Sequence, residues 1–284
     1  MRYGALYQEG RTLLQQALIE EADLDARILL EHVCHTNRND LLVHADKEVT
    51  EVWEHTYRSL IARRAVHIPL QQLTGIQEFM GLEFLVNEHV LIPRQDTEIL
   101  VEEAMRRMQD GMHILDMCTG SGCVLLSLLH YSNETAGLGV DLSLQALEVA
   151  RQNAKQLAIK ADFIQSNLYE QVKKNDKFDM IVSNPPYIPC AVIETLMPEV
   201  KDHEPRMALD GREDGLYYYR EIINTSRYYL HGGASLLLEI GWEQGKQVTE
   251  YMEQAGYTQI EIVQDLAGLN RVVVGTYMEE IKDV

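Results

Sequence analysis

The sequence predicts an α/β protein in which a mostly parallel sheet, wound with helices on both faces, follows a small helical bundle. Two observations predict this class. Apolar residues recur at helical spacing in the first part of the chain, and after residue 93 apolar strands alternate with helical runs. Length and composition are a third observation. A chain of 284 residues suits two globular domains, and 46% hydrophobic with 24% charged side chains excludes collagen-like, coiled-coil and disordered classes.

Residues 1–75 are expected to form the helical bundle. The apolar spacing over residues 6–42 predicts two amphipathic helices, the second of them capped by Asp23, and a third helix opens at Thr50. Over residues 76–92 the apolar period shortens toward two, which predicts a β-hairpin. We expect this hairpin to link the two domains.

Residues 93–284 are expected to form the second domain, a Rossmann-like, mostly parallel sheet of seven strands. The predicted strands cover residues 113–117, 137–140, 162–165, 178–183, 234–240, 260–263 and 271–275, and the predicted helices cover residues 124–129, 144–157, 216–230 and 244–255. In such a sheet the ligand binds at the carboxyl ends of the strands, near the point where the strand order reverses. The residues directly after the strands are therefore the candidate site.

A turn of small residues follows the first predicted strand of the sheet and leads directly into a helix. It consists of Cys118, Thr119, Gly120, Ser121 and Gly122. Its glycines allow main-chain amides, together with the helix N-terminus, to approach a negatively charged group. Asp141 follows the next strand, about twenty residues further on, which is the spacing of an acidic residue that binds ribose hydroxyls. The pair predicts a nucleoside-containing cofactor, although the full Gly-x-Gly-x-x-Gly pattern of dinucleotide sites is absent.

A rigid turn follows the fourth predicted strand. It reads Asn184, Pro185, Pro186 and Tyr187. Two successive prolines remove two N–H donors and leave carbonyl oxygens free as acceptors, and the Asn184 side chain offers one more acceptor. Tyr187 adds a flat face and a hydroxyl. This turn is expected to receive an NH2 group.

With these motifs the chain resembles the class I S-adenosylmethionine-dependent methyltransferases, and among them it is similar to the HemK/PrmC family. The matching stretches lie within residues 69–75, 90–98, 116–122, 184–188, 204–209, 214–220 and 238–241. The resemblance implies a class I methyltransferase fold with S-adenosylmethionine as the cofactor. It also implies methyl transfer to the side-chain amide of the glutamine in the Gly-Gly-Gln motif of peptide chain release factors, with the helical bundle docking the release factor.

The resemblance also implies roles for single residues. Asn167 and Leu168 would border the adenine ring, and Asn184 would contact both the cofactor and the substrate. The Asn184 side-chain oxygen and the Pro185 backbone oxygen would accept the hydrogens of the substrate amide, beside Tyr187. Cys118 stands where the family commonly has glycine. Glu239 and the segment 94–98 have no assigned role, with a structural cap at Asp96 and a place at the substrate entrance both open for that segment.

Two other functions remain as alternatives. An adenine N6 nucleic-acid methyltransferase would use the same NH2 chemistry, and a non-catalytic module that binds S-adenosylmethionine could share the fold. The 44 acidic and 25 basic side chains give a net charge of -19, which argues against direct binding of nucleic acid.

Further expectations concern the protein's partners and surroundings. The four cysteines lack a paired framework and the ten histidines are scattered, so we expect neither disulfides nor a metal site. The sequence shows no secretory signal and no apolar run long enough for a membrane span. We therefore expect a monomer in the cytoplasm that binds no membrane.

Overall fold

The computed structural model describes residues 1–278 and divides the chain into two compact units. The first unit contains Met1–Ile76 together with the short segment Met197–His203, and the second contains Gln77–Leu196 and the residues from Glu204 onward. The chain therefore passes between the two units three times. Within residues 1–278, no helix is both long enough and apolar enough to cross a membrane.

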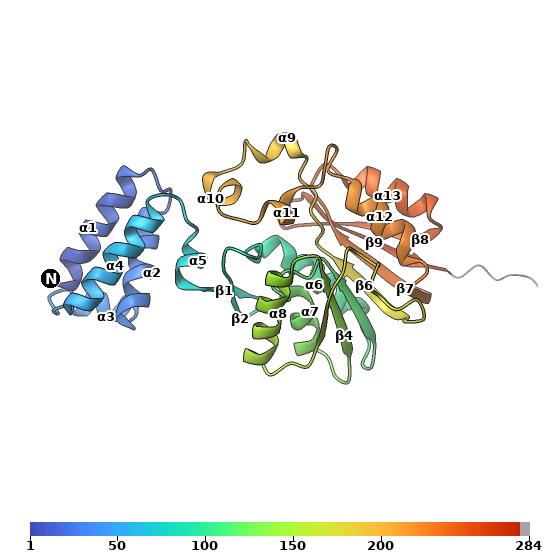
Figure 1. Ribbon diagram of the computed structural model, residues 1–284, viewed down its shortest axis with the longest axis horizontal. Coiled ribbons are helices and arrows are strands. Elements are labelled where there is room, and N and C mark those ends of the chain that lie inside the picture. Colours follow the sequence, from blue (N-terminus) through green and yellow to red (C-terminus); the bar gives the residue numbers. More distant parts are fainter. Residues whose placement is uncertain (279–284) are drawn as a thin grey trace, which may run out of the picture. The chain divides into compact units, whose positions relative to one another are not determined.

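The first unit is a bundle of helices. Its helices are α1 (Tyr3–Gln16), α2 (Ala22–Cys34), α3 (Arg38–Val43), α4 (Glu51–Arg64), α5 (Leu70–Thr74) and α10 (Pro198–Lys201). Helices α1, α2 and α4 pack together around a common apolar core (Figure 1). Thr50 caps α4 as expected, because its hydroxyl oxygen accepts the backbone N–H of Trp53 at 3.3 Å. The prediction that Asp23 caps α2 was wrong: Asp23 lies inside the first turn, and its carboxylate pairs with Arg11 at 2.6 Å.

Buried charges hold the segment Met197–His203 within this bundle. The Arg64 guanidinium donates to Asp25 Oδ2 at 2.7 Å and to Glu199 Oε1 at 3.1 Å. The same Glu199 oxygen lies 2.9 Å from His67 Nδ1. Removing one partner of a buried ion pair costs about 3–5 kcal/mol, so these contacts fix α10 to α2 and α4.

A two-stranded hairpin lies where the sequence places one. Its strands are β1 (Ile76–Phe79) and β2 (Leu82–Leu85). Phe79 and Phe84 are fully buried in the same apolar core as Leu100 of α6 (Gln95–Arg107). The body of the hairpin is therefore packed into the second unit rather than standing free as a connection.

The second unit is organised around a seven-stranded sheet. Its strands are β3 (His113–Met117), β4 (Ala136–Asp141), β5 (Asp162–Gln165), β6 (Phe178–Ser183), β7 (Leu230–Glu239), β8 (Tyr257–Gln264) and β9 (Asn270–Tyr277). They lie in the order β5-β4-β3-β6-β7-β9-β8, in which β9 runs antiparallel to β7 and β8 and the other neighbours are parallel. The chain builds outward from β3 to β5 and then returns to place β6 on the other side of β3. Ligands are expected where the order reverses, at the carboxyl ends of β3 and β6.

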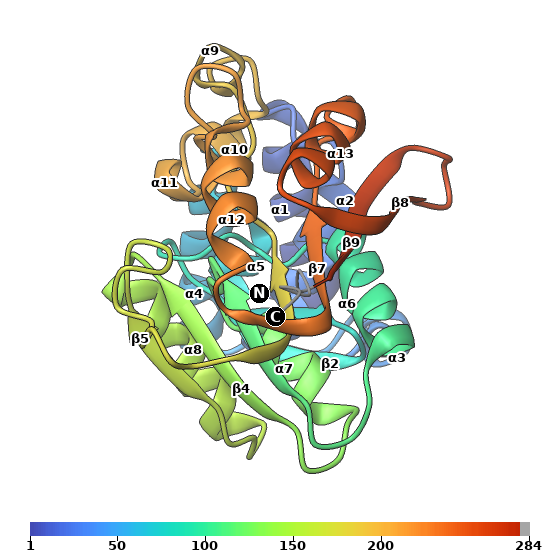
Figure 2. The ribbon, with the colours of Figure 1, turned by 90° about the vertical axis from the view of Figure 1, so that its right-hand side faces the viewer.

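Helices cover both faces of the sheet, as predicted. Helices α6, α7 (Cys123–His130) and α8 (Leu144–Gln156) lie on one face, and α12 (Tyr217–Ser226) and α13 (Gly245–Gln254) lie on the other (Figure 2). Two short helices, α9 (Cys190–Ile193) and α11 (Arg206–Leu209), belong to the long connection between β6 and α12. Asp96 does not cap α6, since the cap position is Arg94 and the Asp96 carboxylate instead pairs with Arg271 at 3.1 Å.

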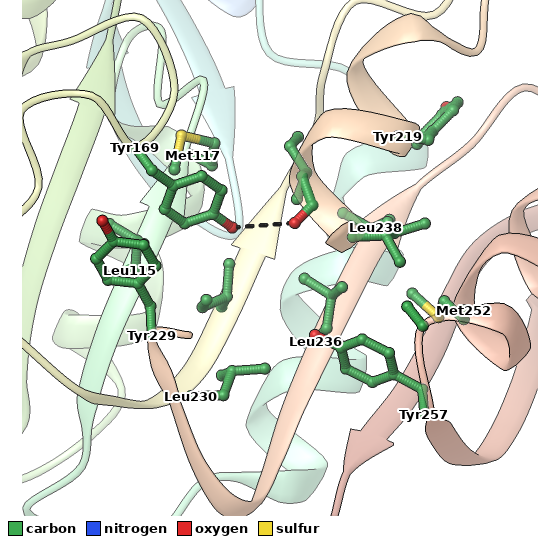
Figure 3. Close-up of a cluster of buried hydrophobic side chains, with 14 of the residues drawn as sticks. Leu115, Met117, Tyr169, Tyr219, Tyr229, Leu230, Leu236, Leu238, Met252 and Tyr257 are labelled. Carbon is green, nitrogen blue, oxygen red and sulfur yellow. Dashed lines mark hydrogen bonds between the residues drawn. The ribbon is translucent and has the colours of Figure 1, made fainter. Parts of the chain in front are cut away.

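Aromatic side chains fill the core on the α12 and α13 face (Figure 3). The rings of Tyr169 and Tyr229 stack with their centroids 4.8 Å apart, and the Tyr169 hydroxyl donates to the backbone oxygen of Ile222 at 3.5 Å. Leu115 of β3 and Leu238 of β7 pack in the same cluster. This core supports the strands whose carboxyl ends carry the candidate site.

Candidate active site

A cavity of about 370 Å³ lies at the carboxyl ends of β3, β4 and β6. Of the residues predicted to hold a cofactor, those that line it are Cys118, Thr119, Gly120, Ser121, Asp141, Asn167, Leu168 and Asn184. Gly122 is not among the lining residues. A Cβ at Gly122 would lie 3.2 Å from Ala150 Cβ and from a methyl group of Leu126, so this glycine allows α7 and α8 to pack closely.

The turn after β3 requires left-handed backbone at three positions. Cys118 has φ +63°, Gly120 has φ +56° and Gly122 has φ +80°. Glycine adopts this conformation without a steric penalty, whereas a side chain at φ near +60° costs about 1–2 kcal/mol. Cys118 thus carries strain at the entry of the turn, at the position where the HemK/PrmC pattern has glycine.

Asp141 holds this turn in place from the end of β4. Its Oδ2 accepts the Gly120 N–H at 2.9 Å, and its Oδ1 accepts the Ser143 N–H at 2.8 Å. The parallel register that pairs Met117 with Val140 brings the two strand ends together. Burial raises the pKa of Asp141, and the two backbone N–H groups oppose that rise.

A second carboxyl group, Asp116, faces the same cavity. Burial raises the pKa of Asp116 to about 7, although the Thr119 hydroxyl donates to its Oδ2 at 2.6 Å. A cationic group bound beside Asp116 would favour its ionised form. The glycine turn and Asp141 therefore suit the nucleoside portion of a ligand such as S-adenosylmethionine, and an ionised Asp116 would attract its positive charge.

Asn184 stands at the edge of the cavity, directly after β6. Its side-chain Nδ2 donates to Thr97 Oγ1 of α6 at 3.2 Å. The strand below it is fixed to β3, because the Ser183 hydroxyl donates to the Met117 backbone oxygen at 2.5 Å. The Asn184 amide is thus held at its nitrogen end.

Tyr187 and Pro185 do not line the cavity, whereas Pro186 does. The Tyr187 hydroxyl donates to Glu239 Oε1 at the end of β7, at 3.3 Å. Burial raises the pKa of Tyr187 above its usual range, with the Glu239 charge adding to the rise. The predicted role of Tyr187 beside the substrate remains a prediction, and the contact that the structure shows is with Glu239.

The turn is supported from behind by a connection that the sequence did not predict. Gln244 Nε2 donates to the backbone oxygens of Tyr187 at 3.0 Å and of Gly215 at 3.2 Å. A Cβ at Gly211 would lie 2.7 Å from the Tyr187 carbonyl carbon. The close approach of these backbones requires glycine, because a side chain would displace the turn.

Asn167 and Leu168 reach the cavity from the segment after β5. Leu168 adopts φ +49°, and its backbone oxygen accepts the Ser166 hydroxyl at 2.7 Å. Asn167 Nδ2 donates to Glu170 at 2.8 Å. Leu168 also packs against the aromatic core, so one residue contributes to both the core and the cavity.

The sequence did not indicate several residues that line the cavity. Arg206 and Arg212 are two of them. They line the cavity together with Arg94, which pairs with Glu204 at 2.6 Å and belongs to the segment 94–98, for which the sequence leaves a place at the substrate entrance open. Tyr218 of α12 also lines it, whereas the next residue, Tyr219, is fully buried in the core. Helical geometry could have predicted that these two tyrosines face different surroundings, because adjacent helix residues point about 100° apart.

The strain at Cys118 predicts that substitution by glycine and substitution by valine change the free energy of unfolding by different amounts. We expect Cys118→Gly to unfold with a free energy within about 1 kcal/mol of the wild type, because relief of strain offsets the greater freedom of the unfolded chain. We expect Cys118→Val to lose about 2 kcal/mol, since a β-branched residue tolerates this conformation least. Urea unfolding of both variants measures the difference. Equal stabilities of the two variants would contradict the strain.

The chain matches known proteins over most of its length. A family profile described as PrmC N-terminal domain matches residues 5–75, and one described as Methyltransferase small domain matches residues 95–196. The release factor glutamine methyltransferase of Geobacter sulfurreducens is 40% identical over 265 residues, which cover 93% of this chain and 93% of that protein. The protein of the same name from Caulobacter vibrioides is 37% identical over 266 residues, which cover 92% of each chain.

A solved structure supports the fold independently. A methyltransferase from Pyrococcus furiosus aligns with a TM-score of 0.53 at 14% identity, over 70% of this chain and 90% of that one. The seven-stranded, mostly parallel sheet with helices on both faces is thus the class I methyltransferase fold that the sequence predicts.

Proposed function

We propose, since the chain belongs to the family of release factor glutamine methyltransferases, that it transfers a methyl group from S-adenosylmethionine to a glutamine side-chain amide in a peptide chain release factor. The glutamine is that of the Gly-Gly-Gln motif. Because release factors act in translation, we place the reaction in the cytoplasm.

One observation of the structure supports this function most strongly. Asn184, held by its nitrogen to Thr97, stands where the cofactor cavity meets the rigid turn after β6. An amide NH2 delivered to this point would meet the Asn184 side-chain oxygen. Pro185, which does not itself line the cavity, would offer its backbone oxygen from the adjacent turn as the second acceptor. Both are acceptors, which is what an NH2 group requires.

The chemistry follows from the weakness of the nucleophile. The lone pair of a glutamine amide nitrogen is delocalised into its carbonyl group, so the nitrogen attacks only when it is well aligned. S-adenosylmethionine, when bound, supplies a methyl group that its sulfonium charge makes electrophilic.

The residues of the turn position the amide and stabilise charge. Asn184 Oδ1 and the Pro185 oxygen accept the two N–H hydrogens, which aligns the nitrogen and disperses the positive charge that grows on it. As the nitrogen–carbon bond forms, the bond between the methyl group and the sulfonium sulfur would break and leave a neutral thioether, and the nitrogen becomes strongly acidic and releases its proton to water. A dedicated base is therefore not needed.

A methyl-transfer assay tests this function. Labelled S-adenosylmethionine is offered with purified release factor, with the same factor carrying another residue in place of the loop glutamine, and with duplex DNA. We expect label on the intact factor alone. Label on DNA would support the adenine N6 reaction instead, and cofactor binding without any transfer would support a non-catalytic module.

A further inference from the structure

The most unusual polar group beside the active site is the carboxyl of Glu239. It ends β7, only 2% of the residue is exposed, and β7 pairs with β6 so that Leu238 lies opposite Ser183. Glu239 therefore lies next to Asn184 at the same edge of the sheet. Its Oε1 accepts the Tyr187 hydroxyl, while its Oε2 is buried and has no hydrogen-bond partner among the described residues. A buried, half-satisfied carboxyl costs folding free energy.

Thr97 connects this carboxyl to Asn184. The Thr97 side chain stabilises the Glu239 carboxylate and so opposes burial, which raises the pKa of Glu239 to about 7. The Thr97 hydroxyl can do so by turning its hydrogen toward the carboxyl, where Glu239 Oε2 is a buried acceptor with no partner among the described residues. The Thr97 hydroxyl also accepts Asn184 Nδ2 at 3.2 Å. Because a hydroxyl has a single hydrogen, turning it toward Glu239 would leave Thr97 only acceptor capacity toward Asn184.

This arrangement would fix which end of the Asn184 amide faces Thr97. An asparagine amide has an oxygen end and an NH2 end that differ little in shape. Only the NH2 end can approach a hydroxyl oxygen whose hydrogen is already donated elsewhere. The oxygen end must then point away from Thr97, where it is available to accept from a substrate.

The charges around Glu239 suit this role. The positive charge of Arg271 from β9 favours the ionised carboxylate, and Asp96 from α6 opposes it. Arg271 pairs with Asp96 at 3.1 Å, which also ties the residue next to Thr97 to β9. Thr97 is itself only 3% exposed in the first turn of α6. The Thr97 hydroxyl is therefore shielded from water, which leaves protein groups as its partners.

We infer that Thr97 and Glu239 are positioning residues that set the orientation of the Asn184 amide, so that its Oδ1 is presented to the substrate NH2 group. The inference rests on the proposed function, because it assigns how the acceptor of that reaction is aligned. Neither side chain needs to touch the substrate. Tyr187 donates to Glu239 Oε1, which keeps the carboxylate directed at the turn.

A matched pair of substitutions at Thr97 tests the inference. Thr97→Val keeps the shape and removes the hydroxyl, whereas Thr97→Ser keeps the hydroxyl. We expect Thr97→Val to lower kcat by about 10- to 100-fold through misalignment of the acceptor, with the Kd for S-adenosylmethionine changed by less than about 3-fold. We expect Thr97→Ser to restore kcat to within about 3-fold of the wild type.

Glu239→Gln provides a second test. A glutamine can accept with its oxygen from one of the two hydroxyls but presents N–H groups toward the other, so Thr97 loses its fixed direction. We expect kcat to fall by about 10-fold. Glu243→Gln makes the same chemical change at an exposed position just beyond β7 and should leave kcat unchanged.

A spectroscopic readout separates this inference from the proposed function. In the nitrogen-15 NMR spectrum, the Asn184 side-chain NH2 signal is assigned by its loss in Asn184→Ala. We expect its hydrogens to exchange with water more slowly than those of the exposed Asn175, and we expect Thr97→Val to remove that protection.

Failure of the proposed function and failure of the inference give different results. A wild-type protein that transfers no methyl group to release factor overturns the proposed function, while the NMR measurement still judges the positioning. Fast exchange of the Asn184 hydrogens in the wild type, or equal kcat values for Thr97→Val and Thr97→Ser, overturns the inference even if methyl transfer is confirmed.

Discussion

Replacing Asn184 by alanine is expected to lower kcat by about 100- to 1,000-fold, which is the cost of losing one aligned group that stabilises developing charge. The Kd for S-adenosylmethionine should change by less than about 3-fold, because the acceptor acts on the substrate amide and its interaction strengthens only in the transition state. Single-turnover methyl transfer measures the first quantity, and calorimetric titration with the cofactor measures the second.

A control makes this result specific to the position of Asn184. Asn175→Ala makes the same chemical change at an exposed site and should leave both quantities unchanged. If Asn184→Ala weakened cofactor binding as much as it lowered kcat, Asn184 would be a cofactor ligand alone. An unchanged kcat would remove Asn184 from the reaction altogether.

Replacing Asp141 by alanine is expected to weaken cofactor binding more than it lowers kcat, which is the reverse of the result for Asn184→Ala. Its carboxylate accepts the N–H groups of Gly120 and Ser143, so the variant loses the order of the glycine turn as well as the predicted contact with the ribose. Hydrogen bonds to charged groups contribute about 1.5–3 kcal/mol each. We therefore expect the Kd for S-adenosylmethionine to rise by about 100-fold, at 1.4 kcal/mol for each factor of ten.

At saturating cofactor, Asp141→Ala should keep kcat within about 10-fold of the wild type, because the acceptor turn after β6 is intact. Asp162→Ala removes an exposed carboxylate from the neighbouring strand β5 and serves as the control. A cofactor affinity of Asp141→Ala equal to that of the control would contradict the role of Asp141 as a cofactor residue.

The sequence predicted those parts of the fold that depend on local patterns. The alternation of apolar strands and helices indicated all seven strands of the sheet, and Thr50 correctly marked the start of α4. The predictions that Asp23 and Asp96 cap their helices were wrong. A carboxylate inside the first turn interacts favourably with the helix dipole, as a capping carboxylate does, so the sequence does not distinguish the two positions. The short helices α9, α10 and α11 span a single turn each, too little for an apolar period to be recognised.

The sequence also predicted the parts of the candidate site that follow directly after a strand, but not the parts that depend on tertiary packing. The turn at Gly120 and the acceptor Asn184 each follow a strand, so their place at one sheet edge could be predicted from the sequence. The contacts of Thr97 and Glu239 could not, because they join residues far apart in the sequence whose proximity depends on how α6 and β7 pack beside β6. Burial also decides their chemistry, and no local pattern around Glu239 indicates that its carboxyl lacks a partner for Oε2.

The most direct test of the whole account is to locate the methyl group. Release factor is incubated with the protein and S-adenosylmethionine, digested, and fragmented in a mass spectrometer so that each residue of the loop peptide is read separately. The account predicts one added methyl group on the side chain of the Gly-Gly-Gln glutamine, absent when the protein carries Asn184→Ala. A methyl group on any other residue, or the same yield from Asn184→Ala, would contradict it.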